Sequence, residues 1–229
     1  MNWDNLEPHS RLHYLLINKK MKEIVPTKVV VIHDNIDETS PIMVEMRVKY
    51  GFENVVLFQH SQLGLDYVIS NLGNKMVVLL DKNFDGNEID GIKVFTEIRE
   101  KTSLVYIILI TVSKISEINS ETLKMLINKD LFKLESFTQD YKKIIELVDQ
   151  ARSTLNVRVD AVIEDWIMRH PIEKREQIIL KTREGISYSM NDILDSIRKE
   201  TSIGLQFERN LLKLAIELFS RQKLKLDDK

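Results

Sequence analysis

The sequence predicts an α/β protein in which five parallel strands form a doubly wound sheet, covered by helices on both faces. Three observations predict this fold. Short aliphatic runs alternate five times with helical patterns between residues 28 and 155. The spacers between the runs are long enough for helical crossovers, which favour parallel pairing. Finally, the 229 residues include only seven glycines and four prolines, which predicts few long loops.

The five expected strands are apolar and rich in β-branched residues, as is typical of strands buried on both faces of a parallel sheet. The most hydrophobic is the fourth. For five strands the commonest doubly wound order is the flavodoxin-like 2-1-3-4-5, in which ligands bind beyond the carboxyl ends of the strands. The expected strands cover residues 29–32, 55–58, 76–80, 105–110 and 131–134.

The helices between these strands are marked by capping residues. Thr39, Ser40 and Pro41 are typical of a helix start, and Gly51 is typical of its end. A capping box of Ser136 and Gln139 predicts the start of a long last helix. The expected helices cover residues 41–50, 61–72, 90–99, 116–127 and 136–155.

Two further regions flank this sheet domain, which we place at residues 28–156. Residues 1–27 form an N-terminal helical extension, with a helix expected from about residue 10 to residue 24 because leucines recur there at helical spacing. Residues 157–229 are expected to be an all-helical output or interaction module. One of its helices begins at Pro171 and ends at Gly185.

Composition excludes several classes of protein. The chain has 33 basic and 35 acidic residues, a net charge of -2, which argues against a polybasic nucleic-acid binder. It has no cysteine, so thiolate catalysis and cysteine zinc sites are excluded. No apolar run is long enough for a membrane span, and lysines interrupt the apolar N-terminal stretch. We therefore expect a cytoplasmic protein. No hydrolase or metalloprotease motif is present, so we expect no enzyme beyond self-catalysed phosphoryl transfer.

Polar residues stand where the expected strands end. Asp34, Asp81 and Thr111 follow or end three strands, and Lys133 lies in the fifth. Two carboxylates at one rim of a sheet can hold a divalent cation. A lysine and a hydroxyl beside them can neutralise and position a phosphoryl group, and one carboxylate can act as the nucleophile that accepts it.

Five stretches resemble the receiver domain of two-component response regulators, over about residues 28–155. They are residues 29–34, 77–81, 90–99, 107–111 and 131–133. The resemblance implies that Asp81 is the phosphoacceptor, and that Mg²⁺ is held by Asp34, Asp81 and the backbone carbonyl of Asn83. It also implies that Thr111 is the switch hydroxyl and Lys133 the phosphate-binding lysine. A histidine kinase or phosphotransfer protein would then be the upstream partner in a phosphorelay.

The sequence departs from the receiver pattern at several positions. His33 replaces the first of two adjacent acids, so we expect weakened Mg²⁺ binding, and His33 is itself a candidate ligand. The alternative is a hydrogen-bonded histidine at a strand end. The loop after Asp81 is about two residues longer than the pattern. Lys133 is followed by Leu134 instead of proline, and Asp130 replaces the aromatic three residues before it.

Three functions remain open. The leading one is a signalling protein in which Mg²⁺-dependent phosphorylation of Asp81 controls a helical module that binds a protein partner or a second protomer. The alternative is a degenerate receiver-like scaffold that is not phosphorylated. A DNA-binding regulator is weaker, because residues 157–229 carry 14 basic and 13 acidic residues, without the basic excess of a DNA-binding surface.

Overall fold

The structure is a computed structural model, and it describes residues 26–112, 114–137, 141–182 and 184–222. The helix expected over residues 10–24 lies outside the described residues. None of the helices within the described ranges is both long and apolar enough to cross a membrane.

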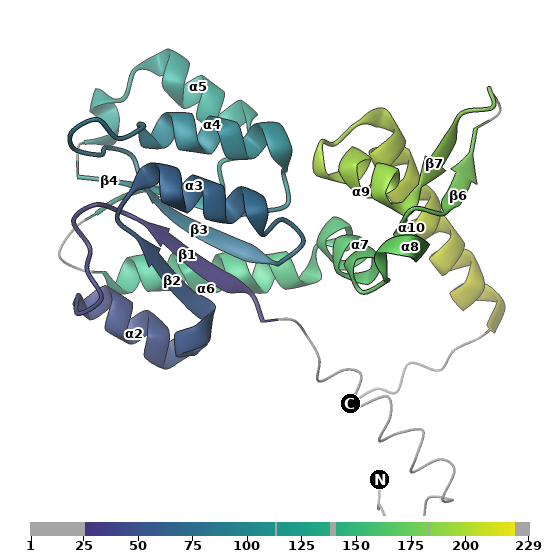
Figure 1. The fold of residues 1–229 in the computed structure, drawn as a ribbon, viewed down its shortest axis with the longest axis horizontal. Helices are drawn as coiled ribbons and strands as arrows, with labels where there is room; N and C mark the ends of the chain where they lie inside the picture. Colours follow the sequence, from purple (N-terminus) through teal and green to yellow (C-terminus); the bar gives the residue numbers. More distant parts are fainter. Residues whose placement is uncertain (1–25, 113, 138–140, 183, 223–229) are drawn as a thin grey trace, which may run out of the picture.

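One five-stranded sheet forms the larger part of the described chain (Figure 1). All of its strand pairs are parallel, and their order is β2-β1-β3-β4-β5. This confirms the predicted fold class and the predicted strand order. The central strands are almost completely buried, which explains their continuous apolar sequences. The strands are β1 (Lys28–Ile32), β2 (Val55–Phe58), β3 (Met76–Asp81), β4 (Tyr106–Thr111) and β5 (Lys133–Ser136).

Helices cover both faces of the sheet, as expected for a doubly wound fold. Helices α2 (Pro41–Tyr50) and α6 (Lys142–Val157) pack on one face. Helices α3 (Ser61–Ser70), α4 (Gly91–Lys101) and α5 (Ser120–Asn128) cover the other (Figure 1). Two short 3₁₀ helices, η2 (Phe52–Asn54) and η3 (Ile115–Glu117), precede β2 and α5.

Local sequence explains where α2 begins and ends and where α4 begins. Pro41 occupies the first turn of α2, and the chain leaves that helix at Gly51 with a positive φ of 93°, a conformation that favours glycine. Asp90 precedes α4, and its side chain accepts a hydrogen bond of 2.6 Å from the backbone N–H of Ile92. Both helix starts were predicted.

Two predicted boundaries around β5 are wrong. The strand covers Lys133–Ser136 instead of residues 131–134, so it starts two residues later than expected. Ser136 belongs to this strand and cannot cap a helix, and α6 begins only at Lys142. The expected helix over residues 116–127 also begins later, at Ser120, because the side chain of Asn119 caps it there.

The C-terminal region is mainly helical, but it is not all-helical as predicted. The helix expected from Pro171 to Gly185 is replaced by a short helix and an antiparallel hairpin, β6–β7. Its run Ile178-Ile179-Leu180 suits a strand as well as a helix, and Gly185 turns the hairpin with a φ of 89°. The elements are α7 (Val159–Met168), α8 (Ile172–Arg175), β6 (Ile178–Lys181), β7 (Ser187–Ser189), α9 (Met190–Arg198) and α10 (Ser202–Gln222).

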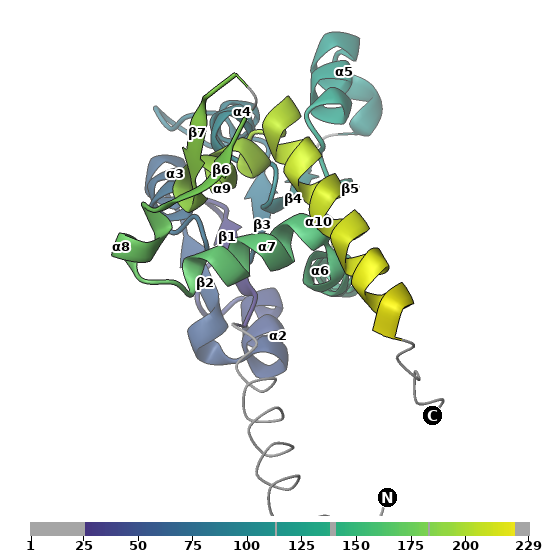
Figure 2. The ribbon, with the colours of Figure 1, turned by 90° about the vertical axis from the view of Figure 1, so that its right-hand side faces the viewer.

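This region packs against the end of the sheet where the strands begin (Figures 1 and 2). Leu104, just before β4, is 3% exposed and belongs to the core cluster of α7 and α9. The backbone N–H of Ser103 donates a 2.8 Å hydrogen bond to the carbonyl of Arg198. The C-terminal region therefore lies at the opposite end of the sheet from the carboxyl ends of the strands.

Candidate functional site

The carboxyl ends of adjacent strands place three of the predicted site residues at one edge of the sheet. Asp34 follows β1, and Asp81 is the last residue of β3, its neighbour. Thr111 is the last residue of β4, one position beyond the partner of Asp81, and it is fully buried. The strand order that the sequence predicts is what creates this arrangement.

His33 lies between the two carboxylates. Its Nδ1 atom is 3.4 Å from Asp34 Oδ1 and 3.4 Å from Asp81 Oδ2. One potential ligand atom from each of the three residues lies within 4.8 Å of the other two. His33 is 4% exposed and Asp81 is 6% exposed. The histidine that replaces an acid in the receiver pattern is therefore a member of the buried cluster.

Backbone N–H groups hold both carboxylates in place. Asp34 Oδ2 accepts a 3.0 Å bond from the N–H of Asp85, and Asp81 Oδ1 accepts a 3.2 Å bond from the N–H of Asn83. Asp34 Oδ1 also accepts a 2.7 Å bond from the side chain of Asn35. The loop between β3 and α4 is thus bonded to the cluster, and Asn83 takes part in it through its N–H.

The same long loop is bonded a second time, to the start of α3. The Glu88 carboxylate accepts 2.8 Å and 2.7 Å bonds from the backbone N–H and hydroxyl of Ser61, and it lies 2.9 Å from His60 Nδ1. These contacts lower the pKa of Glu88 to about 2, the bond with His60 most of all. The sequence analysis missed Glu88, which no motif distinguishes.

Burial is the main influence on the titration of the cluster. It raises the pKa of Asp81 to about 6, with the charge of Asp34 acting in the same direction and the Asn83 hydrogen bond opposing it. Burial also lowers the pKa of His33, against the attraction of Asp34. At neutral pH the imidazole is therefore neutral, and the cluster has no positive side chain of its own.

The structure does not bring Lys133 to this cluster. Lys133 is the first residue of β5, opposite Ile108, and its Nζ lies 5.5 Å from the centre of the Phe132 ring. The residue of β5 that lies level with Asp81, across Ile110, is Glu135. The carboxylate of Glu135 is 2.9 Å from Lys143 Nζ.

Glu135 occupies this level of β5, and the sequence analysis did not single it out. Phe132 stands three residues before Glu135, which is the aromatic spacing that the receiver resemblance implies for the lysine. That spacing was the available signal, and the presence of a lysine two residues away concealed it. Asp130, expected as the substitute for the aromatic, is instead a turn residue with a φ of 54°.

Other acids near the cluster have separate roles. Asp37 Oδ1 accepts hydrogen bonds of 2.8 Å from the N–H of Thr39 and 3.1 Å from the hydroxyl of Ser40. Glu38 forms an ion pair with Arg47 of α2. Neither belongs to the group formed by His33, Asp34 and Asp81.

No protein-family model and no curated protein matches the sequence. Solved structures that match include a CheY-like response regulator receiver domain from Methanospirillum hungatei (12% identity, 57% of this chain and 96% of that chain, TM-score 0.43). Another is the response regulator TrrA from Thermotoga maritima in complex with Mg²⁺-BeF (20%, 55% and 98%, TM-score 0.40). A third is NtrX from Brucella abortus in complex with ATP (17%, 76% and 34%, TM-score 0.47). These structures are what the chain is similar to, and the strand order itself establishes the fold of the sheet domain.

Proposed function

We propose that this chain is a response-regulator-like signalling adaptor whose Asp81 pocket works without phosphoryl transfer and whose C-terminal region binds protein. The observation that carries the proposal is the position of Glu135. It lies level with Asp81 in the sheet, in the row where a phosphate-binding lysine would have to stand. Asp34 and the imidazole of His33 lie beside the residue that would carry the phosphate, and an acid stands in the row of β5 that would supply the lysine.

Electrostatics supports this proposal. A phosphoryl group adds about two negative charges, and the charge of Asp34 already disfavours ionisation of Asp81. Lys133 is displaced from that row by two residues, roughly 7 Å along a strand. The nearer Lys82 donates a 2.8 Å hydrogen bond to the side chain of Asn83. A phosphoryl group on Asp81 would lie beside the acid Asp34, with no lysine at the level of Asp81 in β5.

A labelling experiment tests the pocket. With Mg²⁺ and a small-molecule phosphodonor, we expect no acyl phosphate on the wild-type protein. The double variant His33→Asp/Glu135→Lys supplies the missing acid and lysine, so it should be labelled, and a further Asp81→Asn change should abolish that label. Lys133→Gln is the matched control and should leave the double variant labelled.

The competing function is the Mg²⁺-dependent phosphoacceptor. Two observations favour it. Asp81 lies close to Asp34, and Thr111 ends the adjacent strand one position beyond the partner of Asp81. Labelling of the wild-type protein that disappears in Asp81→Asn would overturn the proposal and establish this alternative.

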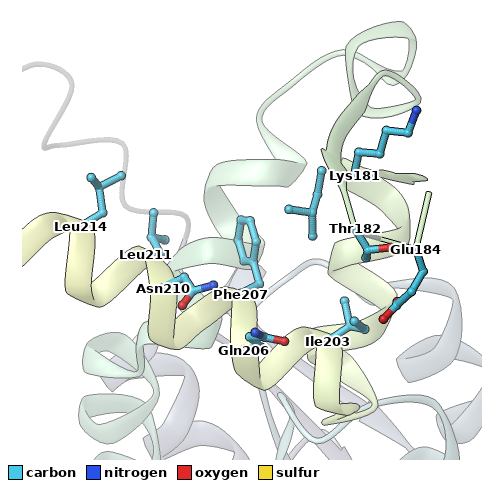
Figure 3. A pocket seen from close by; sticks show the side chains of 10 residues that line it. Lys181, Thr182, Glu184, Ile203, Gln206, Phe207, Asn210, Leu211 and Leu214 are labelled. Atoms are coloured by element: carbon cyan, nitrogen blue, oxygen red, sulfur yellow. The ribbon is translucent and has the colours of Figure 1, made fainter. Parts of the chain in front are cut away.

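The surface proposed for partner binding is the long helix α10 with the hairpin beside it. A groove of about 700 Å³ lies between them, and Phe207 projects from α10 toward the hairpin (Figure 3). On other sides of α10, Leu212 and Ile216 are 44% and 64% exposed. A helix with so much apolar surface usually packs against another element. The groove is lined by Leu180, Lys181, Thr182, Glu184, Ile203, Gln206, Phe207, Asn210, Leu211 and Leu214.

A further inference from the structure

We propose that His33, Asp34 and Asp81 form a site for a four-coordinate divalent cation of the zinc class, and that Mg²⁺ does not fit it well. The inference concerns the pocket named in the proposed function and rests on that assignment. It does not depend on the surface that binds a partner. Three observations carry it: the chemistry of the donor atoms, their separation, and the hydrogen bonds that orient them.

The donor set is mixed. Mg²⁺ binds oxygen ligands almost exclusively and keeps a near-ideal octahedral shell. An imidazole nitrogen is instead a common ligand of Zn²⁺, which also accepts carboxylate oxygens. In this cluster His33 stands between the two acids and 3.4 Å from each. A cation that contacts both carboxylates therefore meets the imidazole as well.

The separations favour the same class of cation. A tetrahedral ion with bonds of 2.0–2.1 Å spaces its ligands roughly 3.4 Å apart. An octahedral Mg²⁺ with bonds of the same length spaces adjacent ligands only about 2.9 Å apart. Nδ1 of His33 lies 3.4 Å from Asp34 Oδ1 and 3.4 Å from Asp81 Oδ2. Both distances are close to the edge of a tetrahedron, and the candidate ligand atoms of the two carboxylates lie within 4.8 Å of each other.

The Nδ1 atom of His33 is positioned to act as a ligand. It accepts a hydrogen bond of 3.1 Å from the backbone N–H of Asn35, and it faces one oxygen of each carboxylate. A cation between these atoms would be attracted by both carboxylates and would take the place of the Asn35 N–H as the partner of Nδ1.

The surroundings orient the donors for such a site. The second oxygen of each carboxylate accepts a backbone N–H, from Asp85 for Asp34 and from Asn83 for Asp81. Outer bonds of this kind fix the direction of metal ligands. The Asp34 side chain is 17% exposed, so water can reach the cluster there and supply a fourth ligand.

Metal titrations of the full chain test the site. Affinities for Zn²⁺ and for Mg²⁺ are measured by chelator competition on the wild type and on His33→Asp. We expect the ratio of zinc to magnesium affinity to fall about tenfold or more in this variant. Asp34→Asn should weaken Zn²⁺ binding while keeping the imidazole. His60→Asn is the matched control, because His60 is 65% exposed and lies outside the cluster, and it should leave the ratio of zinc to magnesium affinity unchanged.

Cobalt provides a second readout, since four-coordinate Co²⁺ absorbs visible light much more strongly than six-coordinate Co²⁺. We expect the strong bands in the wild type and their loss in His33→Asp. Equal zinc-to-magnesium ratios in the wild type and His33→Asp, or weak octahedral bands in the wild type, would overturn the inference. Phosphodonor labelling of the wild type would instead overturn the proposed function, and the metal titrations do not measure that reaction.

Discussion

Gly91 lies so close to the backbone of Asp81 that the protein has no room for a side chain there. A Cβ atom on Gly91 would be 1.9 Å from the carbonyl oxygen of Asp81. The first turn of α4 is thereby held against the end of β3, and the loop between them is closed by a 3.0 Å bond from the N–H of Gly91 to the carbonyl of Lys82. The absence of a Cβ atom at Gly91 thus allows α4 to begin directly against Asp81, at the edge of the pocket.

We predict that Gly91→Ala lowers the free energy of unfolding by about 3 kcal/mol, because backbone atoms must move apart. Gly86→Asn is the control. A Cβ at Gly86 meets nothing within 4 Å, and asparagine tolerates its φ of 74°, so we expect a loss below about 1 kcal/mol. Denaturant unfolding measures both, and equal losses would contradict the steric argument.

The Glu88 contacts predict a pH-dependent stability. The carboxyl group has an ordinary pKa of 4.5, and in the folded protein its pKa is about 2. Ionised Glu88 therefore contributes its full stabilisation of the folded state above pH 4.5, and this contribution is lost as the pH falls toward 2. Glu88→Gln should lower the melting temperature at pH 7, with the difference from the wild type shrinking below pH 4.5. A difference that is constant with pH would show that the charge is not responsible.

At the scale of elements, α10 is exposed over most of its described length. Its first turns pack on α9 through Ile203 and Phe207, while Leu212 and Ile216 face outward. The helix extends away from the rest of the C-terminal region (Figure 2). At 1.5 Å per residue its 21 residues span about 30 Å, long enough to present one continuous surface to another helix.

We predict that the wild-type chain self-associates as its concentration rises, and that Leu212→Lys/Ile216→Lys weakens this association at least tenfold. The substitutions remove exposed apolar area and add repelling charges. Light scattering over a concentration series measures the change. The melting temperature of the monomer should stay within 2 °C of the wild type, since neither side chain is buried. If the variant associates as strongly as the wild type, the face of α10 that carries Leu212 and Ile216 is not the site of self-association.

Element types were predictable from sequence where long patterns define them, but register was not. The runs that became β1, β3 and β4 are unambiguous because they are continuous, apolar and bounded by polar residues. β5 has the sequence Lys-Leu-Glu-Ser, with no apolar run to mark it. Only pairing with β4 places Glu135 level with Ile110, and the local signal, Phe132 three residues earlier, was concealed by the lysine at position 133. This is why Lys133 was selected for the site.

At the scale of the whole molecule, the C-terminal region shares its core with the sheet domain through Leu104. We predict that Leu104→Ala lowers the free energy of unfolding by about 2–4 kcal/mol and separates one thermal transition into two. The reason is that Leu104 is 3% exposed and packs in the cluster of α7 and α9. Calorimetry measures both effects. Leu63→Ala on α3 is the control, because Leu63 is 55% exposed and should behave like the wild type.

The site was predictable to a similar extent as the fold. The sequence placed Asp34, Asp81 and Thr111 at strand ends, and the parallel topology brings those ends to one edge. The contact of His33 with both acids required side-chain directions, which spacing does not supply. The division at residues 156 and 157 stays a prediction, although α6 ends at Val157 and α7 begins at Val159.

The docking of the last helices on Leu104 has a consequence for the order in which the chain is made. Leu104 leaves the ribosome about 90 residues before Ile197, a member of the same core cluster, which at 5–20 residues per second is roughly 5–18 s of synthesis. The sheet ends at Ser136, so it can form during that interval while its apolar contact with α7 and α9 is still uncovered. Nascent chains that stop before α9 would therefore expose an apolar surface around Leu104 that is buried in the full-length protein.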